Sequence, residues 1–158
     1  MTGDAGRTGS GARGPRFCLV AARFNQRWVE RLTAGAREVL AGQGVPDADV
    51  ETLWVPGSLE LPLACRWAAA SGRFDAILAF GVVLRGETEH FRLVAEVSAH
   101  GLARVALDTG VPVLNGVIAA HHPEQVEERA GGRRGNRGAE VALAALEMAR
   151  LRCRAEAR

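Results

Sequence analysis

The sequence predicts an α/β protein in which helices cover both faces of a four-stranded parallel sheet, giving a three-layer α/β/α sandwich. Three observations support this fold class. Four short, almost continuously apolar segments are each followed by a segment whose apolar residues recur at helical spacing, which is typical of strands alternating with helices. The apolar segments lack a polar face, as expected for parallel strands that are buried on both sides and joined by right-handed crossovers. The chain has 158 residues, of which 47% are hydrophobic and 24% charged, so it suits one globular domain.

The predicted strands are short apolar runs that end at turn residues. The first is the run Phe-Cys-Leu-Val-Ala-Ala, and Pro56-Gly57 ends the second. The four predicted ranges are 17–22, 50–55, 74–83 and 112–119. Strands of this kind, each followed by a helix, predict a flavodoxin-like sheet.

The predicted helices begin at capping residues and end at glycines. Asn25, Ser58 and Asn136 are suited to be N-caps, and Pro123 stands at a plausible first helical position. Gly110 closes the longest helix. The five predicted ranges are 26–41, 59–70, 89–109, 123–130 and 137–152.

The folded domain is predicted to span residues 17–152, between two tails. Residues 1–16 hold five glycines and no apolar stretch, which favours a disordered tail over a signal peptide. Residues 153–158 are predicted to be a short C-terminal tail. No apolar run approaches the ~20 residues that a membrane helix needs.

The composition excludes several classes of protein. All 20 basic residues are arginine, so neither a lysine Schiff base nor a P-loop lysine is available. The net charge of +2 is too balanced to indicate a nucleic-acid-binding protein. The three cysteines are widely spaced and form no CxxC motif, which argues against a disulfide framework or zinc site and favours the reducing cytoplasm.

The ends of the predicted strands carry the residues with chemical potential. In parallel α/β sheets, ligands bind outside the carboxyl ends of the strands. The first strand delivers Phe24 there, the second Glu60 and the third a Gly86-Glu87-Thr88 turn followed by His90. Backbone N–H groups of a turn that enters a helix can bind an anion, and an imidazole can move protons near neutral pH.

Each of these features also has an ordinary structural explanation. The turn at 86–88 could be a routine helix cap, Phe24 could belong to the core, and His90 could be a solvated surface residue. The adjacent His121 and His122 are poor evidence for a metal, because neighbouring side chains point in different directions and no second ligand pair at helical spacing is present. The glycine- and arginine-rich segment at 131–138 resembles an RNA-binding tract, but a connection between two helices explains it better. Only the arrival of the strand-end groups at one rim argues for a site.

A set of motifs, in order along the chain, resembles one known family. The motifs are ARFN at 22–25, VPGSLELP at 55–62, GVVLRGETEHF at 81–91, ERAG at 128–131, GNRG at 135–138 and ALEM at 145–148. They are similar to those of 6,7-dimethyl-8-ribityllumazine synthase, over residues 17–151.

This resemblance implies a transferase of riboflavin biosynthesis. The amine of 5-amino-6-(D-ribitylamino)uracil would condense with the ketone of 3,4-dihydroxy-2-butanone 4-phosphate, phosphate would be eliminated, and the second ring would close. The imine forms between the two substrates, so no lysine, metal or redox cofactor is implied.

The resemblance also implies roles for individual residues. His90 would be the general acid and base. Phe24 would stack on the pyrimidine ring, and Arg129 would bind the phosphate, with Asn115 and Arg129 coming from a neighbouring subunit. The other substrate-binding positions that it implies are Ser58, Leu59 and Glu60 for the ribityl chain and ring, the backbones of Val82, Val83 and Leu84 for the uracil edge, those of Glu87 and Thr88 for the phosphate, and Arg137.

The sequence departs from the family at several of these positions. The family usually has an aromatic residue where Asn115 stands and a lysine where Arg137 stands. It often has Asp-Tyr at 92–93, where this chain has Arg-Leu, and usually two threonines and an acid at 119–121, where this chain has Ala-Ala-His. We expect these departures to affect substrate affinity and fidelity more than fold or reaction class.

Family members assemble, and the resemblance implies a homopentamer. The short glycine-bounded loop at 131–135 matches the type that builds a sixty-subunit icosahedral capsid, with riboflavin synthase as the candidate enclosed partner. The sequence leaves open whether the assembly is a pentamer, a decamer or a 60-mer. Two other functions stay open: a non-catalytic lumazine- or flavin-binding or shell-forming relative, and, less favoured, a flavodoxin-type electron carrier, which would need a Ser/Thr-rich loop at 21–25.

Overall fold

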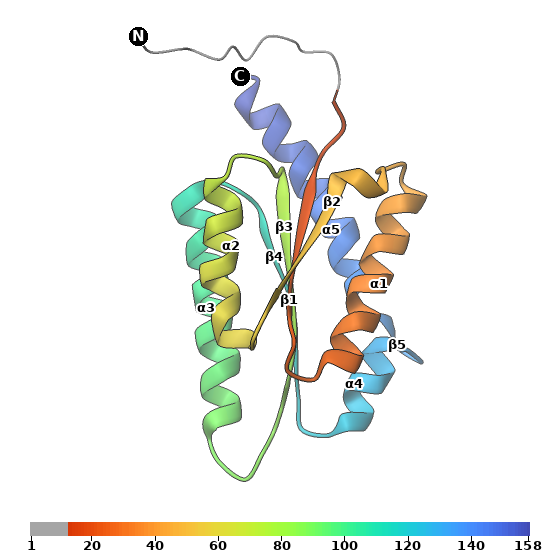
Figure 1. Cartoon of the computed structure of the whole chain (residues 1–158), viewed down its shortest axis with the longest axis vertical. Coiled ribbons are helices and arrows are strands. Elements are labelled where there is room, and N and C mark those ends of the chain that lie inside the picture. Colours follow the sequence, from red (N-terminus) through yellow and green to blue (C-terminus); the bar gives the residue numbers. More distant parts are fainter. Residues whose placement is uncertain (1–12) are drawn as a thin grey trace.

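The computed structural model describes residues 13–158 and contains a central sheet of four parallel strands. The strands are β1 (Phe17–Ala22), β2 (Val50–Val55), β3 (Ala76–Leu84) and β4 (Val113–Ala120). Their order in the sheet is β2-β1-β3-β4. With helices on both faces, the molecule is the three-layer α/β/α sandwich of flavodoxin-like type that the sequence predicts (Figure 1).

Five helices lie in the described part of the chain, and they divide between the two faces of the sheet. The face carrying α2 (Leu61–Ala70) and α3 (His90–Thr109) is on the left in Figure 1. The opposite face carries α1 (Gln26–Gly42), α4 (Pro123–Arg129) and α5 (Arg137–Glu156). The predicted ranges match these helices to within two residues, except at the end of α5, which continues four residues further.

Two hydrophobic cores share the central strands. In β1, Phe17, Leu19 and Ala21 face the core with α1 and α5, whereas Cys18 and Val20 face the core with α2 and α3. All six residues of β1 are fully buried. The alternation of side chains across a strand explains why a continuous apolar run is needed here, because both faces must be apolar.

All four strands were predicted to be buried on both faces, but the two edge strands are less buried than that. In β2 and β4 several side chains are partly or fully exposed, among them Leu53 and Asn115. An edge strand pairs with a neighbour on one side only, so its outer border reaches solvent.

Local capping differs from the prediction at Asn25 and Ser58. Asn25 precedes α1 in a left-handed conformation with φ of 60°, and its side chain does not cap the helix. Ser58 begins a short 3₁₀ turn, Ser58–Glu60, ahead of α2 and makes no capping bond. Asn136 does cap α5, because its Oδ1 accepts hydrogen bonds from the backbone N–H groups of Gly138 and Ala139.

Residues of both predicted tails make contacts with, or continue, the folded domain. Residues 1–12 lie outside the described residues, but Arg16 is held: its N–H donates to Asp75 Oδ2 at 2.6 Å, and its carbonyl accepts from the Asp75 N–H. At the other end, α5 continues to Glu156 and includes most of the predicted tail 153–158. The hydrogen bond from Arg152 Nε to Glu156 Oε1, four residues on, supports this last turn.

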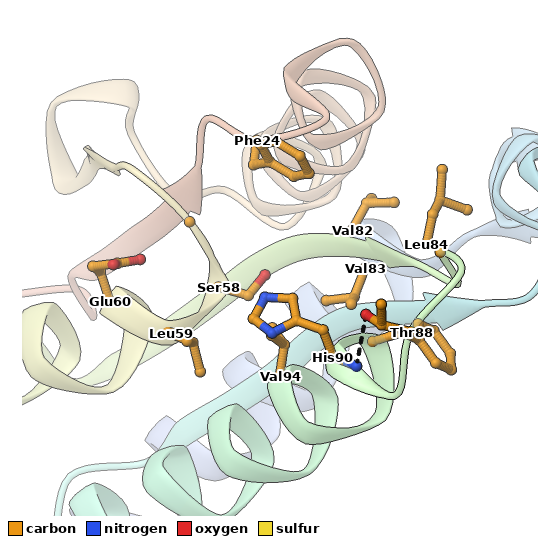
Figure 2. A pocket seen from close by; sticks show the side chains of 13 residues that line it. Phe24, Ser58, Leu59, Glu60, Val82, Val83, Leu84, Thr88, His90 and Val94 are labelled. Carbon is orange, nitrogen blue, oxygen red and sulfur yellow. Dashed lines mark hydrogen bonds between the residues drawn. The ribbon is translucent and has the colours of Figure 1, made fainter.

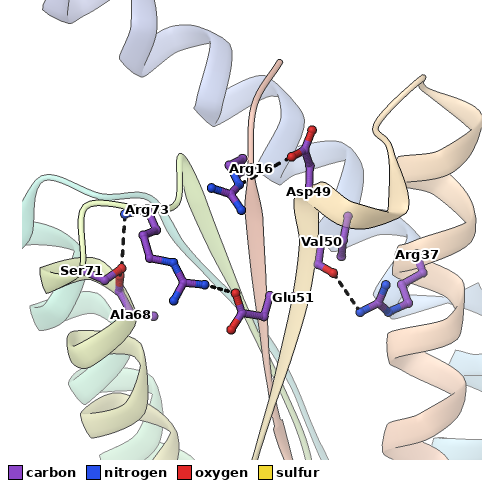
Figure 3. A network of polar contacts seen from close by, with 8 residues as sticks. All are labelled: Arg16, Arg37, Asp49, Val50, Glu51, Ala68, Ser71 and Arg73. Carbon is purple, nitrogen blue, oxygen red and sulfur yellow. Dashed lines mark hydrogen bonds and ion pairs between the residues drawn. The ribbon is translucent and has the colours of Figure 1, made fainter. Parts of the chain in front are cut away.

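Polar contacts tie the amino-terminal end of the sheet to its helices (Figure 3). Arg37 of α1 donates to the carbonyl of Val50 at 3.2 Å and to Thr52 Oγ1 at 2.8 Å. On the other side, Arg73 pairs with Glu51. These contacts leave the carboxyl ends of the strands, at the opposite end of the sheet, free to form a site.

The segment between α4 and α5 was predicted to be a simple connection and is instead a small hairpin. Its strands are β5 (Ala130–Gly132) and β6 (Gly135–Asn136), paired antiparallel. Within residues 13–158, no helix is both long and apolar enough to cross a membrane.

Candidate active site

A cavity of about 320 Å³ opens at the carboxyl ends of the central strands. It lies between the β1–α1 turn, the 3₁₀ turn before α2, and the start of α3 (Figure 2). Its lining combines an aromatic ring, a hydroxyl group, a carboxylate and an imidazole with apolar side chains. The predicted site residues that line it are Phe24, Ser58, Leu59, Glu60, Val82, Val83, Leu84, Thr88 and His90.

Phe24 presents its ring to the cavity because the turn beneath it is fixed on two sides. The side chain is 73% exposed, so Phe24 is not a core residue. Its N–H donates to the carbonyl of Pro56 at 3.1 Å, and Nδ2 of the next residue, Asn25, donates to the carbonyl of Val82 at 2.8 Å. An exposed flat ring held in this way can stack on a planar heterocycle.

The second wall comes from the 3₁₀ turn at Ser58–Glu60. Ser58 is buried, and its hydroxyl points toward the cavity, whereas Leu59 and Glu60 are exposed at its border. Gly81 of β3 makes room for this hydroxyl, because a Cβ at that position would lie 2.5 Å from Ser58 Oγ. The glycine that precedes Val82 is therefore required by the shape of the site.

The end of β3 supplies backbone groups as well as side chains. β3 pairs with β1 as far as Phe80, but it pairs with β4 as far as Leu84. On the side facing β1, the segment from Val82 to Leu84 therefore has no strand partner within residues 13–158, and Asn25 occupies one of its carbonyls. Unpaired peptide groups beside a cavity can bind the polar edge of a ligand.

His90 and Thr88 lie at the entrance to α3. His90 is the first residue of the helix, it is exposed, and its ring projects into the cavity. Its N–H donates to Thr88 Oγ1 at 3.4 Å, so the threonine side chain closes the turn before the helix. The imidazole is thus accessible to a ligand and attached to the first turn of a 20-residue helix.

Glu87 faces a different cavity. Its neighbours there include Arg85, Arg92 and His121, and the ring of His121 lies 5.6 Å from that of Phe91 between centroids. The carboxylate of Glu87 is therefore not among the groups lining the site, and only its backbone can take part in an anion-binding turn.

Three further predicted residues lie apart from the site within their own chain. Asn115 is exposed on β4, and Arg129 and Arg137 line a separate polar cavity with Arg134 and Glu140. Nη2 of Arg137 lies 3.4 Å from the carbonyl of Asn115, to which it donates. The fold therefore gathers these residues at a second location that is not part of the His90 cavity.

Four residues that line the cavity were not predicted to bind substrate, and two of them, Phe91 and Val94, were not singled out individually. Gly57 and Gly86 belong to the two turns already singled out, and Phe91 and Val94 belong to α3. The position of Val94, four residues after His90 on a helix, was a usable signal because residues at this spacing share one face.

The cysteines supply no nucleophile to this cavity. Burial raises the pKa of Cys18 to about 12 and also raises the pKa of Cys65 strongly. Both thiols therefore stay protonated near neutral pH. Because only the thiolate form of cysteine is a strong nucleophile, neither is reactive. Cys153 is exposed near the end of α5.

Comparison with known proteins assigns the chain to a family. A family model described as 6,7-dimethyl-8-ribityllumazine synthase matches residues 14–152. The chain belongs to this family. A relative from Stenotrophomonas maltophilia (strain R551-3), named 6,7-dimethyl-8-ribityllumazine synthase, is 52% identical over 136 residues, which cover 86% of this chain and 88% of the relative. One of the same name from Xanthomonas euvesicatoria pv. vesicatoria (strain 85-10) is 49% identical with the same coverage. The family resemblance predicted from the sequence motifs is thus confirmed.

Proposed function

We propose that the His90 cavity is the active site of a 6,7-dimethyl-8-ribityllumazine synthase, a transferase of riboflavin biosynthesis. Membership of the family supports this activity over the non-catalytic alternative. The observation that carries the location of the site is the convergence of Phe24, Glu60 and His90, from three separate segments, on one cavity.

The uracil substrate fits the cavity by its chemistry. Its flat ring stacks on Phe24, and its polar edge bonds to the free backbone at the end of β3. The hydroxyl groups of its ribityl chain reach Ser58 and Glu60, and the Glu60 carboxylate accepts hydrogen bonds from them. Leu59 supplies apolar contact at the border of the cavity.

His90 moves the protons of the condensation. The amine nitrogen attacks the ketone carbon of the butanone phosphate, and water leaves as the imine forms. A phosphate group then leaves, and the second amine closes the ring on the remaining carbonyl carbon with loss of a second water, which completes the product. Each step needs a proton delivered or removed, and an exposed imidazole can do both near neutral pH. The turn at Glu87 and Thr88 offers backbone N–H groups to the phosphate.

A neighbouring copy of the chain completes the site. Asn115, Arg129 and Arg137 do not line the His90 cavity of their own chain, so the copies that bind a substrate held there come from another subunit. Exposed apolar side chains on α2 and α3, including Leu63, Trp67 and Val97, offer surface for such contacts. The pentamer, the capsid, riboflavin synthase as a partner and the cytoplasmic location stay predictions.

The decisive experiment mixes purified protein with both substrates and follows lumazine fluorescence and phosphate release. Product should appear only when both substrates are present, with one phosphate released for each lumazine formed. Binding of the uracil substrate without product would contradict the proposal and favour a non-catalytic relative.

A further inference from the structure

The polar cavity that contains Arg129 and Arg137 also contains a third arginine, to which the family resemblance gives no role. It measures about 460 Å³, and its lining side chains are Arg129, Arg134, Arg137 and Glu140. Three guanidinium groups thus face one carboxylate. Arg134 is the new element here, because neither the sequence motifs nor the family assignment gives it a role.

The partners of these arginines leave binding capacity free. Arg137 is paired with Glu140 at 3.1 Å, and Arg134 lies 3.6 Å from Glu128, which does not line the cavity. Both pairs are exposed, so each contributes little and can rearrange when an anion arrives. For Arg129, no ion pair is found within residues 13–158. Even when Glu128 is counted with Glu140, the three arginines of the cavity outnumber the carboxylates.

The hairpin fixes where Arg134 stands. The backbone N–H of Arg134 donates to the carbonyl of Glu128 at 2.9 Å, which ties the hairpin turn to the end of α4 beside Arg129. The pairing of Gly132 with Gly135 closes the turn that holds Arg133 and Arg134. Both arginines are exposed, but Arg134 alone of the two lines the cavity.

We propose that Arg134 is an additional phosphate-binding residue. Together with Arg129, it binds the phosphate group of the butanone phosphate and, after the reaction, the inorganic phosphate that is released. This inference rests on the proposed function, in which Arg129 meets that group at the shared site. A dianionic phosphate offers several acceptor oxygens, and planar guanidinium groups suit them in pairs. A second guanidinium beside Arg129 therefore strengthens binding of the phosphate-bearing substrate and leaves binding of the neutral uracil substrate unchanged.

Arg133 provides a matched control for the test. Arg134→Ala and Arg133→Ala remove the same charge from the same turn, so a general effect of charge appears in both, and the exposed Arg134–Glu128 pair that only the first variant loses contributes little. We expect Arg134→Ala to raise the KM for the butanone phosphate, and the inhibition constant of inorganic phosphate, by about tenfold, the equivalent of one charge-assisted hydrogen bond. The KM for the uracil substrate and kcat should stay close to those of the unchanged protein. Arg134→Lys should restore part of the affinity.

Phosphate binding is also measured directly, by titrating inorganic phosphate into the assembled protein in a calorimeter. Equal effects of the two alanine variants, or no effect of Arg134→Ala on phosphate binding, would overturn the role of Arg134. Failure of the unchanged protein to form lumazine would instead overturn the proposed function, while the calorimetric comparison of the variants would still decide whether Arg134 binds phosphate.

Discussion

Among the residues that line the His90 cavity, the titratable ones are Glu60 and His90, and they lie apart in Figure 2. Glu60 stands at the border formed by the 3₁₀ turn, whereas His90 projects from the start of α3. Only His90 lies next to the turn that offers N–H groups to a phosphate. Under the proposed function, this separation gives the proton transfers to His90 and the hydroxyl contacts to Glu60.

Replacing His90 with alanine should therefore slow the reaction without abolishing binding. A positioned general acid and base contributes about a hundredfold to the rate, so we expect His90→Ala to lower kcat by about that factor. The KM for the uracil substrate should change little, since Phe24 and the backbone of β3 remain. Steady-state lumazine formation measures both quantities. His100→Ala, on an exposed part of the same helix, is the matched control, and unchanged turnover in His90→Ala would remove the imidazole from the mechanism.

At the scale of elements, α1 and α5 pack so closely that one position accepts only glycine. A Cβ on Gly138 would overlap the carbonyl oxygen of Leu32 in α1. Neither helix can give way easily, because Asn136, which caps α5, also donates to the carbonyl of Arg31 in α1. This contact sets the spacing of the two helices that cover one face of the sheet.

Gly138→Ala should therefore destabilise the protein by about 3 kcal/mol, the upper part of the usual range for overpacking. Urea unfolding followed by circular dichroism provides the measurement. Gly42→Ala, at the end of α1, serves as the control because nothing lies within 4 Å of a Cβ there. If the two variants were equally stable, the close approach of α1 and α5 would be wrong.

A second link between elements depends on pH. Glu127 of α4 accepts a hydrogen bond from Trp28 Nε1 at 2.8 Å and another from Arg31 of α1. These two bonds hold the pKa of the Glu127 carboxyl below its usual value, and the bond from Trp28 has the larger effect. Because the pKa is lower in the folded state, the stabilising contribution is complete above the unfolded pKa and is lost as pH falls through the folded one.

Glu127→Gln should consequently reduce the free energy of unfolding most near neutral pH. The gap between this variant and the unchanged protein should shrink as the solution is made acidic, since protonation removes the same charge. Urea titrations at a series of pH values provide the test, with Glu124→Gln on the same helix as the control. A gap independent of pH would show that the charge of Glu127 does not stabilise the packing of α4 on α1.

At the scale of the whole molecule, the proposed sharing of the active site between chains should let two impaired variants rescue each other. His90→Ala damages the cavity of its own chain, whereas Arg129→Ala damages the contribution that a chain makes to its neighbour. Subunits of the two variants, dissociated, mixed and reassembled, should form some sites with both native residues. We expect lumazine formation above that of either variant alone. An absence of rescue in assemblies that sedimentation shows to be mixed would contradict a site shared between chains.

Much of the fold could be predicted from local patterns. The run at 17–22 and the helical spacing over 26–41 depend on burial and periodicity, which are properties of neighbouring residues. The hairpin between α4 and α5 was missed because its glycines and arginines carry no alternation of apolar residues. The last turn of α5 was missed because its support, the pair Arg152–Glu156, is a side-chain contact rather than an apolar pattern.

By itself, the sequence determined the order of strands and helices, the family, and the strand ends from which Phe24, Glu60 and His90 arise. Only the tertiary structure decided that these residues line one cavity, that β3 extends beyond β1 there, and that Arg134 stands beside Arg129. The physical reason is the range of the interactions. Apolar periodicity acts between near neighbours in the chain, whereas the bond from Asn25 to Val82 and the space that Gly81 leaves for Ser58 join segments that meet only when the sheet and its helices pack.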